Sequence, residues 1–108
     1  LDDFFNIKPV SLARNLRCNY YKYIARIEGR LSRSKIKRQL AEKHKIRLSG
    51  EVHEIPCHRQ PVFKEKFLGG PFPNADNICR KHICLPIYVS MTEKEARYVI
   101  DSLVNYAV

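Results

Sequence analysis

The sequence has no long apolar run, no paired C-x-x-C motif and no glycine-rich loop followed by lysine or serine. A membrane-spanning helix needs about 18 or more consecutive apolar residues, so we expect no membrane association. The absence of a C-x-x-C pair leaves the chain without the usual zinc-knuckle spacing. The absence of a phosphate loop argues against a nucleotide site of that type. No charged-then-apolar leader suggests export, so we expect a cytoplasmic protein.

The length and composition indicate one folded domain. The chain has 108 residues, close to the commonest domain size, and its hydrophobic fraction of 44% is too high for a disordered tail. Its four cysteines follow no secreted-scaffold pattern, and a chain of this size has no need of covalent staples. We therefore expect four free thiols in a reducing compartment.

Positive charge is concentrated in the first half of the chain. Residues 1–50 hold 13 Lys/Arg against 4 Asp/Glu, whereas residues 51–108 hold 7 of each, so the net charge of +9 arises before residue 51. A basic half of this kind, with three tyrosines in residues 19–28, permits an alternative function as a binding module for nucleic acid or an acidic protein. The aromatic signature of RNA-recognition strands is absent, so nucleic acid is the less favoured partner.

Hydrophobic periodicity predicts the order of elements. Residues 1–18 read as an irregular lead-in containing Pro9, and residues 19–28 alternate as a half-buried strand. A surface helix with a serine cap and a narrow apolar edge is expected over 32–45, and a second short strand over 46–52.

In the second half of the chain the sequence again predicts helices and a strand in alternation. Asn74 is a plausible cap for a helix that carries Cys79 and His82 on its apolar face, and residues 85–89 read as a strand. Thr92 and Glu95 fit a capping box that opens the most regular helix of the chain. These elements predict an α+β fold, a small two-layer sandwich with a mainly antiparallel sheet of about three strands and helices on one face.

Five residues are of types that bind zinc, and one of them, Cys57, is also a candidate nucleophile. They are Cys57, His58, Cys79, His82 and Cys84. Cys79 and His82 lie on a face expected to be buried, where cysteine behaves as a small hydrophobe, so we favour structural thiols over a metal site. Cys57 and His58 are neighbours on an extended segment and point to opposite sides, so we favour a packed Cys57 over a catalytic one.

The segment 51–63, EVHEIPCHRQPVF, combines reactive side chains with two prolines. It is followed by "PNAD" at 73–76, "LPIY" at 85–88 and "MTEKE" at 91–95. In order and spacing these motifs resemble the C-terminal small domain of the DegT/DnrJ/EryC1/StrS aminotransferases over residues 19–108, whereas the 1–18 lead-in resembles it poorly. The family pattern near 51–63 is "HYPxPLHxQPxY"-like.

The resemblance implies a function and a set of site residues. Family members are fold type I, pyridoxal-phosphate enzymes that aminate nucleotide-linked keto-sugars or cyclitols. His58 and Gln60 match the "PLHxQ" part and His53 stands beside the usual His-Tyr pair, where this chain has Val52-His53. The resemblance thus makes His53, His58 and Gln60 substrate-binding residues held by the prolines, with no catalytic and no metal-binding residue.

The same resemblance assigns the bond chemistry elsewhere. Transamination needs a lysine for the Schiff base and a phosphate cup, which in the family belong to a large N-terminal domain. No lysine in this chain has the apolar surroundings that a nucleophilic lysine requires. We therefore expect pyridoxal phosphate only in the full-length parent, the large domain as partner, no catalysis by the chain alone, and self-association through the apolar surface left open.

Overall fold

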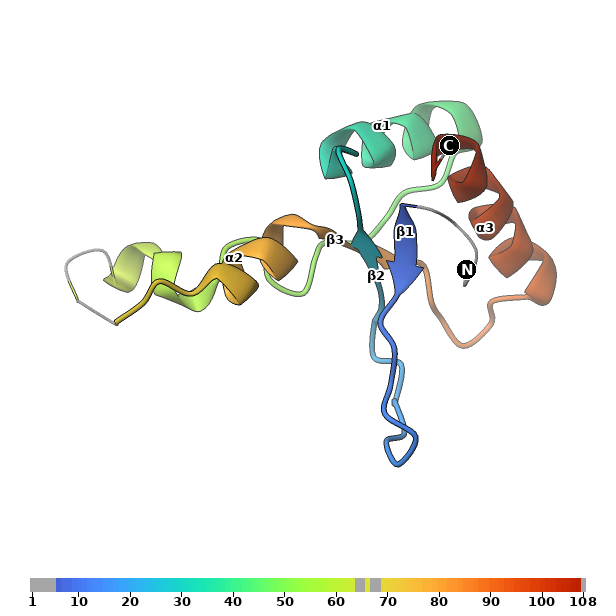
Figure 1. Cartoon of the computed structure of the whole chain (residues 1–108). Coiled ribbons are helices and arrows are strands. Elements are labelled where there is room, and N and C mark those ends of the chain that lie inside the picture. The colour runs from blue at the N-terminus through green and yellow to red at the C-terminus, as the bar shows by residue number, and fades with distance from the viewer. Residues whose placement is uncertain (1–5, 64–65, 67–68, 108) are drawn as a thin grey trace.

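Three short antiparallel strands form a sheet in the order β1-β2-β3, with β2 in the centre (Figure 1). The computed structural model describes residues 6–63, 66 and 69–107, the side chains of 105–107 excepted. The elements are β1 (Ile7–Pro9), β2 (Tyr23–Ile27), α1 (Arg33–His44), the 3-10 turns η1 (Cys57–Arg59) and η2 (Pro61–Phe63), α2 (Pro73–Arg80), β3 (His82–Leu85) and α3 (Glu93–Ala107). The predicted α+β class is confirmed.

The core lies on one face of the sheet, beneath α1 and α3. Ala25 on β2 lies opposite Pro9 on β1 and Ile83 on β3. Ala25 and Ile83 are fully buried. Because side chains alternate across a strand, every second residue of β2 faces this core. The helices supply the other half of the core. Their buried residues are Ile36, Leu40, Val99 and Leu103.

Both long helices begin at the caps that the sequence indicated. The Ser32 side chain accepts a hydrogen bond from the Lys35 amide at the start of α1. At the start of α3, the Glu95 amide donates to Thr92 Oγ1 at 3.2 Å and the Thr92 amide donates to Glu95 Oε2 at 2.8 Å. This reciprocal pair is a capping box and satisfies two amides that no helical carbonyl reaches.

The lead-in contains a strand that we did not predict. Residues 1–5 lie outside the described residues, but Ile7–Pro9 pair with β2 as an edge strand, with Ile7 fully buried against the core. Proline is tolerated because β1 is an edge strand and Pro9 is its last residue. The expectation of an irregular 1–18 segment was therefore wrong for these residues.

The strand expected over 46–52 does not form, although all seven residues are described. Ile46 is buried in the core, but the backbone beyond it pairs with lysine side chains instead of a strand. Lys37 Nζ donates to the Ser49 carbonyl at 3.4 Å and Lys22 Nζ to the Gly50 carbonyl at 2.7 Å. These ammonium groups satisfy the carbonyls that a neighbouring strand would otherwise bind.

The boundary between α2 and β3 also differs from the prediction. The helix begins at Pro73, so Asn74 lies inside it and Phe72 occupies the cap position without a side-chain hydrogen bond. The strand starts at His82, so His82 and Cys84 belong to β3 and not to the helix. Pairing with β2, sixty residues earlier in the chain, fixes this strand, and local periodicity does not report such a contact.

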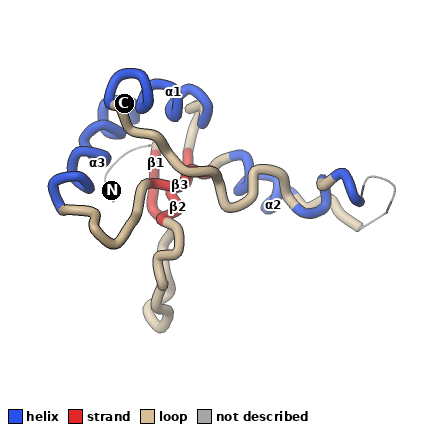
Figure 2. The backbone as a smooth tube through the Cα atoms, turned by 180° about the vertical axis from the view of Figure 1, so that it is seen from behind, coloured by secondary structure: helices blue, strands red, loops and turns tan. Residues whose placement is uncertain are grey.

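Two segments project from the sheet and its helices (Figures 1 and 2). The described residues of 51–80 (51–63, 66 and 69–80), here called the arm, carry η1, η2 and α2 away from the side where α3 lies. Residues 10–22, the β1–β2 loop, extend in another direction. The molecule consequently measures 48 × 36 × 26 Å although it has one small core. Within the described residues, no helix has the length and apolarity that crossing a membrane demands.

Replacing Leu40 by alanine should destabilise the fold strongly. Leu40 is fully buried between α1 and the sheet, so we expect a loss of about 2–5 kcal/mol in the free energy of unfolding. Urea denaturation measures it. The matched control is Leu16→Ala in the β1–β2 loop, where the side chain is 61% exposed and the loss should stay within about 0.5 kcal/mol. Equal losses would contradict the placement of the core.

Candidate functional site

The arm is joined to the rest of the molecule through a buried carboxylate. The Glu51 side chain is only 6% exposed, and its Oε1 accepts from Lys37 Nζ at 2.9 Å and lies 4.0 Å from Arg33 Nε. Burial opposes ionisation of this carboxyl, but the Lys37 hydrogen bond and the charges of Lys37 and Arg33 together lower the pKa of Glu51. Glu51 therefore ties the root of the arm to α1 as a carboxylate.

Arg33 connects α1 with two further segments. Its Nη1 donates to the Cys79 carbonyl at 2.7 Å, near the end of α2, and its Nη2 lies 3.5 Å from Glu54 Oε1 on the arm. A guanidinium presents five donors in a rigid fork, so one side chain can hold several partners at once. The amino end of α1, the end of α2 and the root of the arm are thus fixed together.

His82 supplies a second attachment at the same place. Its Nδ1 donates to the Ile78 carbonyl at 2.6 Å, which leaves Nε2 to accept from the Val52 amide at 3.3 Å. Because a carbonyl can only accept, the first bond assigns the proton to Nδ1. His82 is 3% exposed and both ring nitrogens are bonded, so its role is structural.

Asp76 holds the middle of the arm together. Its Oδ1 lies 3.1 Å from His58 Nε2, and Arg59 donates to both of its oxygens, at 3.0 Å for Nη2 to Oδ2. The Arg59 hydrogen bond is the main cause that lowers the pKa of Asp76. The Phe72 ring packs on the His58 ring, with centroids 5.0 Å apart. The carboxylate of α2 therefore orients two consecutive side chains of η1.

The three expected substrate residues differ in what holds them. His58 is oriented by Asp76, and Gln60 Nε2 donates to the Ile55 carbonyl at 2.8 Å, which closes the turn around the prolines. His53 is exposed and makes no hydrogen bond or ion pair with the described part of the chain. All three lie on the arm, but the contacts of His58 and Gln60 stabilise the arm itself. Substrate binding by these residues stays a prediction.

Asp76 and Arg59 are site residues that our sequence reasoning did not select. The available signal was the "PNAD" motif at 73–76, which places an acidic residue in the first turn of a helix. Periodicity does not indicate that this helix packs against residues 57–60, because the contact spans some 18 positions of sequence. Glu51 was missed for a similar reason, since its partners are on α1.

The cysteines do not form a reactive or metal-binding cluster. All four thiols are free; Cys79 and Cys84 are buried, as expected, and Cys18 is half-buried. The expectation of a packed Cys57 was wrong, because Cys57 is exposed on η1. Within the described residues, no three His, Cys, Asp or Glu side chains are grouped so that they could hold a metal ion.

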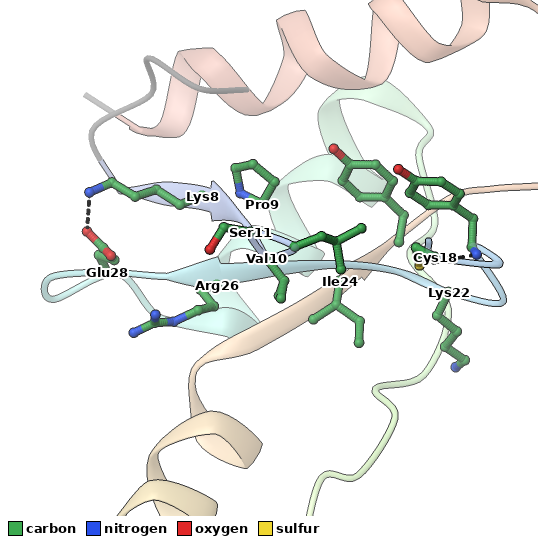
Figure 3. Close-up of a pocket in the computed structure, with 12 residues that line it drawn as sticks. Lys8, Pro9, Val10, Ser11, Cys18, Lys22, Ile24, Arg26 and Glu28 are labelled. Carbon is green, nitrogen blue, oxygen red and sulfur yellow. Dashed lines mark hydrogen bonds and ion pairs between the residues drawn. The ribbon is translucent and has the colours of Figure 1, made fainter. Parts of the chain in front are cut away.

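The face of the sheet opposite the helices is partly open. A groove of about 710 Å³ runs along it, between β2 and the β1–β2 loop (Figure 3). Ile24 forms part of its floor, Val10 and Cys18 line the loop side, and Arg26 and the Lys8–Glu28 ion pair line the other end. Glu28 is the one acidic residue among its lining residues and is paired with Lys8, whereas Lys22 and Arg26 add positive charge, so this groove is apolar with a mainly basic rim.

The lysines that the structure describes do not fit a Schiff base with pyridoxal phosphate. None of those in the described residues is buried. Lys37 is paired with Glu51, Lys22 donates to the Gly50 carbonyl, and Lys81 donates to the Gly29 carbonyl at 2.8 Å. A nucleophilic lysine needs a desolvated pocket that lowers its pKa. The described lysines lack such surroundings.

Comparison with protein families identifies the chain. The model of the DegT/DnrJ/EryC1/StrS aminotransferase family matches residues 1–104, nearly the whole chain. The chain belongs to this family. The match takes in β1 and extends through the arm into α3.

Two curated relatives are similar in sequence. The uncharacterized protein MJ1066 of Methanocaldococcus jannaschii is 34% identical over 77 residues, which cover 68% of this chain and 20% of that protein. The spore coat polysaccharide biosynthesis protein SpsC of Bacillus subtilis is 28% identical over 89 residues, which cover 78% of this chain and 22% of SpsC. The chain thus spans about a fifth of the length of these relatives.

A solved structure shares the fold. The structure of DesV of S. venezuelae, in complex with a ketimine intermediate, matches 97% of this chain with a TM-score of 0.81 and 20% sequence identity. The chain covers 27% of that protein. At this identity the likeness concerns the fold alone, including the arrangement of the sheet and its projecting segments.

Replacing Glu51 by glutamine should loosen the root of the arm. The exchange removes the charge that holds Lys37 and Arg33, and we expect a loss of about 1–3 kcal/mol in the free energy of unfolding at neutral pH. Faster amide hydrogen exchange over residues 49–60 should accompany it. Glu42→Gln, an equal change of charge at an exposed position of α1, is the control and should alter neither measurement.

The contribution of Glu51 to the free energy of unfolding should decrease at low pH. The pKa of this carboxyl is lowered in the folded state from its ordinary 4.5, so its contribution is complete above that value and disappears as the pH falls below it. The stability difference between the native chain and Glu51→Gln, measured by urea denaturation from pH 7 to pH 3, should therefore shrink below about pH 4.5. A difference that stays constant to pH 3 would show that Glu51 does not act as a carboxylate.

Proposed function

We propose that the chain acts as the C-terminal small domain of a pyridoxal-phosphate aminotransferase that aminates nucleotide-linked keto-sugars or cyclitols. In this role it shapes the substrate side of an active site whose lysine and phosphate cup belong to a larger domain. The observation that supports the proposal most is the family match over 1–104 by a chain that spans only a fifth to a quarter of its relatives.

The class of substrate is supported by what is known of the relatives. SpsC is a spore coat polysaccharide biosynthesis protein, and DesV was solved with a ketimine intermediate. A domain that shares the fold of part of DesV and is similar in sequence to part of SpsC is consistent with amination of a sugar. The matched segment is 22% of SpsC and 27% of DesV, which leaves room in both for the domain that holds the cofactor.

The arm supports the proposed division of labour. It has too few buried apolar side chains to be a core, since Pro56 is the only buried apolar residue among residues 51–63, yet polar contacts hold it in one position. Groups that position a substrate act best when they are ordered before binding. We propose that His58, oriented by Asp76, and Gln60 line the substrate entrance, with His53 available for a further contact.

The open face of the sheet is the surface we assign to the larger domain. Its groove is apolar with a basic rim, and an exposed apolar concavity of this size usually marks a site of association. An acidic rim on the partner would complement Arg26 and the basic residues of the β1–β2 loop.

Joining the chain to the large part of DesV, in place of the quarter that it matches, tests the proposal. The fusion should show the visible absorbance of lysine-bound pyridoxal phosphate and aminate a nucleotide-linked keto-sugar, whereas the 108-residue chain alone should do neither. Visible absorbance in the isolated chain, abolished by exchanging one of its lysines, would contradict the proposal.

Within the fusion, His58→Ala and Gln60→Ala should raise KM for the sugar by about tenfold each, because each removes about one hydrogen bond to substrate. The absorbance of the bound cofactor should be unchanged. His44→Ala is the matched control: it removes the same side chain from the end of α1, away from the arm. If His44→Ala raises KM as much as His58→Ala, the assigned role of the arm is wrong.

A further inference from the structure

A second pocket, distinct from the open face of the sheet, lies where α1 begins. It is open to solvent, has a volume of about 670 Å³ and is lined by the start of α1, the end of α2 and the root of the arm. Five cationic side chains line it, and they come from segments far apart in the sequence. They are Arg30, Arg33, Lys37, Arg80 and Lys81. We call this the basic pocket.

The pocket has more positive charge than its own acidic residues can neutralise. Glu51 and Glu54 are the carboxylates among its lining residues, which leaves an excess of three positive charges. Both carboxylates are engaged by Arg33, and Glu51 by Lys37 as well. Arg30 and Arg80 are exposed and make no hydrogen bond or ion pair with the described part of the chain. Their donors are therefore available to a ligand.

The floor of the pocket is fixed, in contrast to an ordinary cluster of surface lysines. Arg33 is held by the Cys79 carbonyl at 2.7 Å, Lys37 by Glu51 at 2.9 Å, and Lys81 by the Gly29 carbonyl at 2.8 Å. The hydroxyls of Ser32 and Ser34 are hydrogen-bonded to each other at 2.9 Å, which leaves the O–H of one of them as a further donor on the α1 side. Fixing donors in advance lowers the entropy lost when a ligand binds.

We propose that the basic pocket binds a phosphate or pyrophosphate group. Paired guanidinium groups match the tetrahedral oxyanion because each can donate two parallel hydrogen bonds. A phosphate ester carries a charge of about −1.5 to −2 at neutral pH, so one or two linked phosphates balance the excess of three. Arg30 and Arg80 contact the oxyanion, and Lys81 and the two serines complete its donors. This site does not depend on the proposed aminotransferase function.

Titration of the 108-residue chain with sodium pyrophosphate, followed by amide chemical shifts, tests the site. We expect saturable one-to-one shifts at residues 30–34 and 79–82. The double variant Arg30→Gln/Arg80→Gln should bind about tenfold or more weakly, since it loses two charge-assisted donors. Both side chains are exposed and without protein partners in the described residues, so the thermal midpoint should be unchanged.

Arg38→Gln is the matched control. This variant replaces one arginine by glutamine at an exposed position of α1 that does not line the pocket. The affinity of the Arg38→Gln chain for pyrophosphate should stay within about twofold of the native value. If no saturable shifts appear up to about 10 mM pyrophosphate, the dissociation constant is weaker than millimolar. That result would overturn the proposal. Equal weakening in Arg38→Gln and the double variant would also overturn it, because it would indicate attraction by net charge alone.

Two further ligands identify the source of the phosphate. Tighter binding of a nucleoside diphosphate than of pyrophosphate, with the same loss in the double variant, supports a nucleotide-borne group; equal affinities support a free anion. A single-stranded oligonucleotide that binds more tightly than pyrophosphate and loses affinity equally in Arg38→Gln would overturn the pocket in favour of a distributed nucleic-acid surface.

Discussion

Contact between the helices and one face of a three-stranded sheet is the interaction on which the rest of the molecule depends. Ala25 and Ile83 are paired across β2 and β3 and covered by α1 and α3, with Ile7 of β1 completing the layer. Because this face holds nearly all the buried apolar side chains, everything beyond it must be held by other forces. The arm, the β1–β2 loop and the open face are all projections of one small core.

Outside the core, polar contacts hold the segments in place. Arg33, Lys37 and His82 bind the root of the arm through Glu51, Glu54 and the Val52 amide, and Asp76 binds η1 to α2. Hydrogen bonds and ion pairs are directional, so they fix position well while contributing less stability than apolar burial. An element held in this way can be placed accurately without a core of its own.

Sequence patterns predicted those parts of the fold that are decided locally. The serine cap of α1 and the capping box of Thr92 and Glu95 were correct because each is decided within four residues. The prediction of a strand over 46–52 was wrong, because lysine side chains bind the carbonyls of this segment. The predicted position of the third strand was also wrong, because its partner β2 lies about sixty residues earlier in the chain. A motif likewise selected His58 and Gln60 as candidates, whereas the contact of Asp76 with His58 depends on a helix packed against residues 57–60, which no local pattern reports.

The attachment of residues 46–52 by lysine side chains has a consequence for how such domains diversify. A strand fixes its register residue by residue, whereas an ammonium at the end of a flexible stem accepts any carbonyl within reach. Lys22 and Lys37 bind the carbonyls of Gly50 and Ser49 in this manner. Insertions or deletions just before the arm can therefore shift its reach while the sheet keeps its geometry.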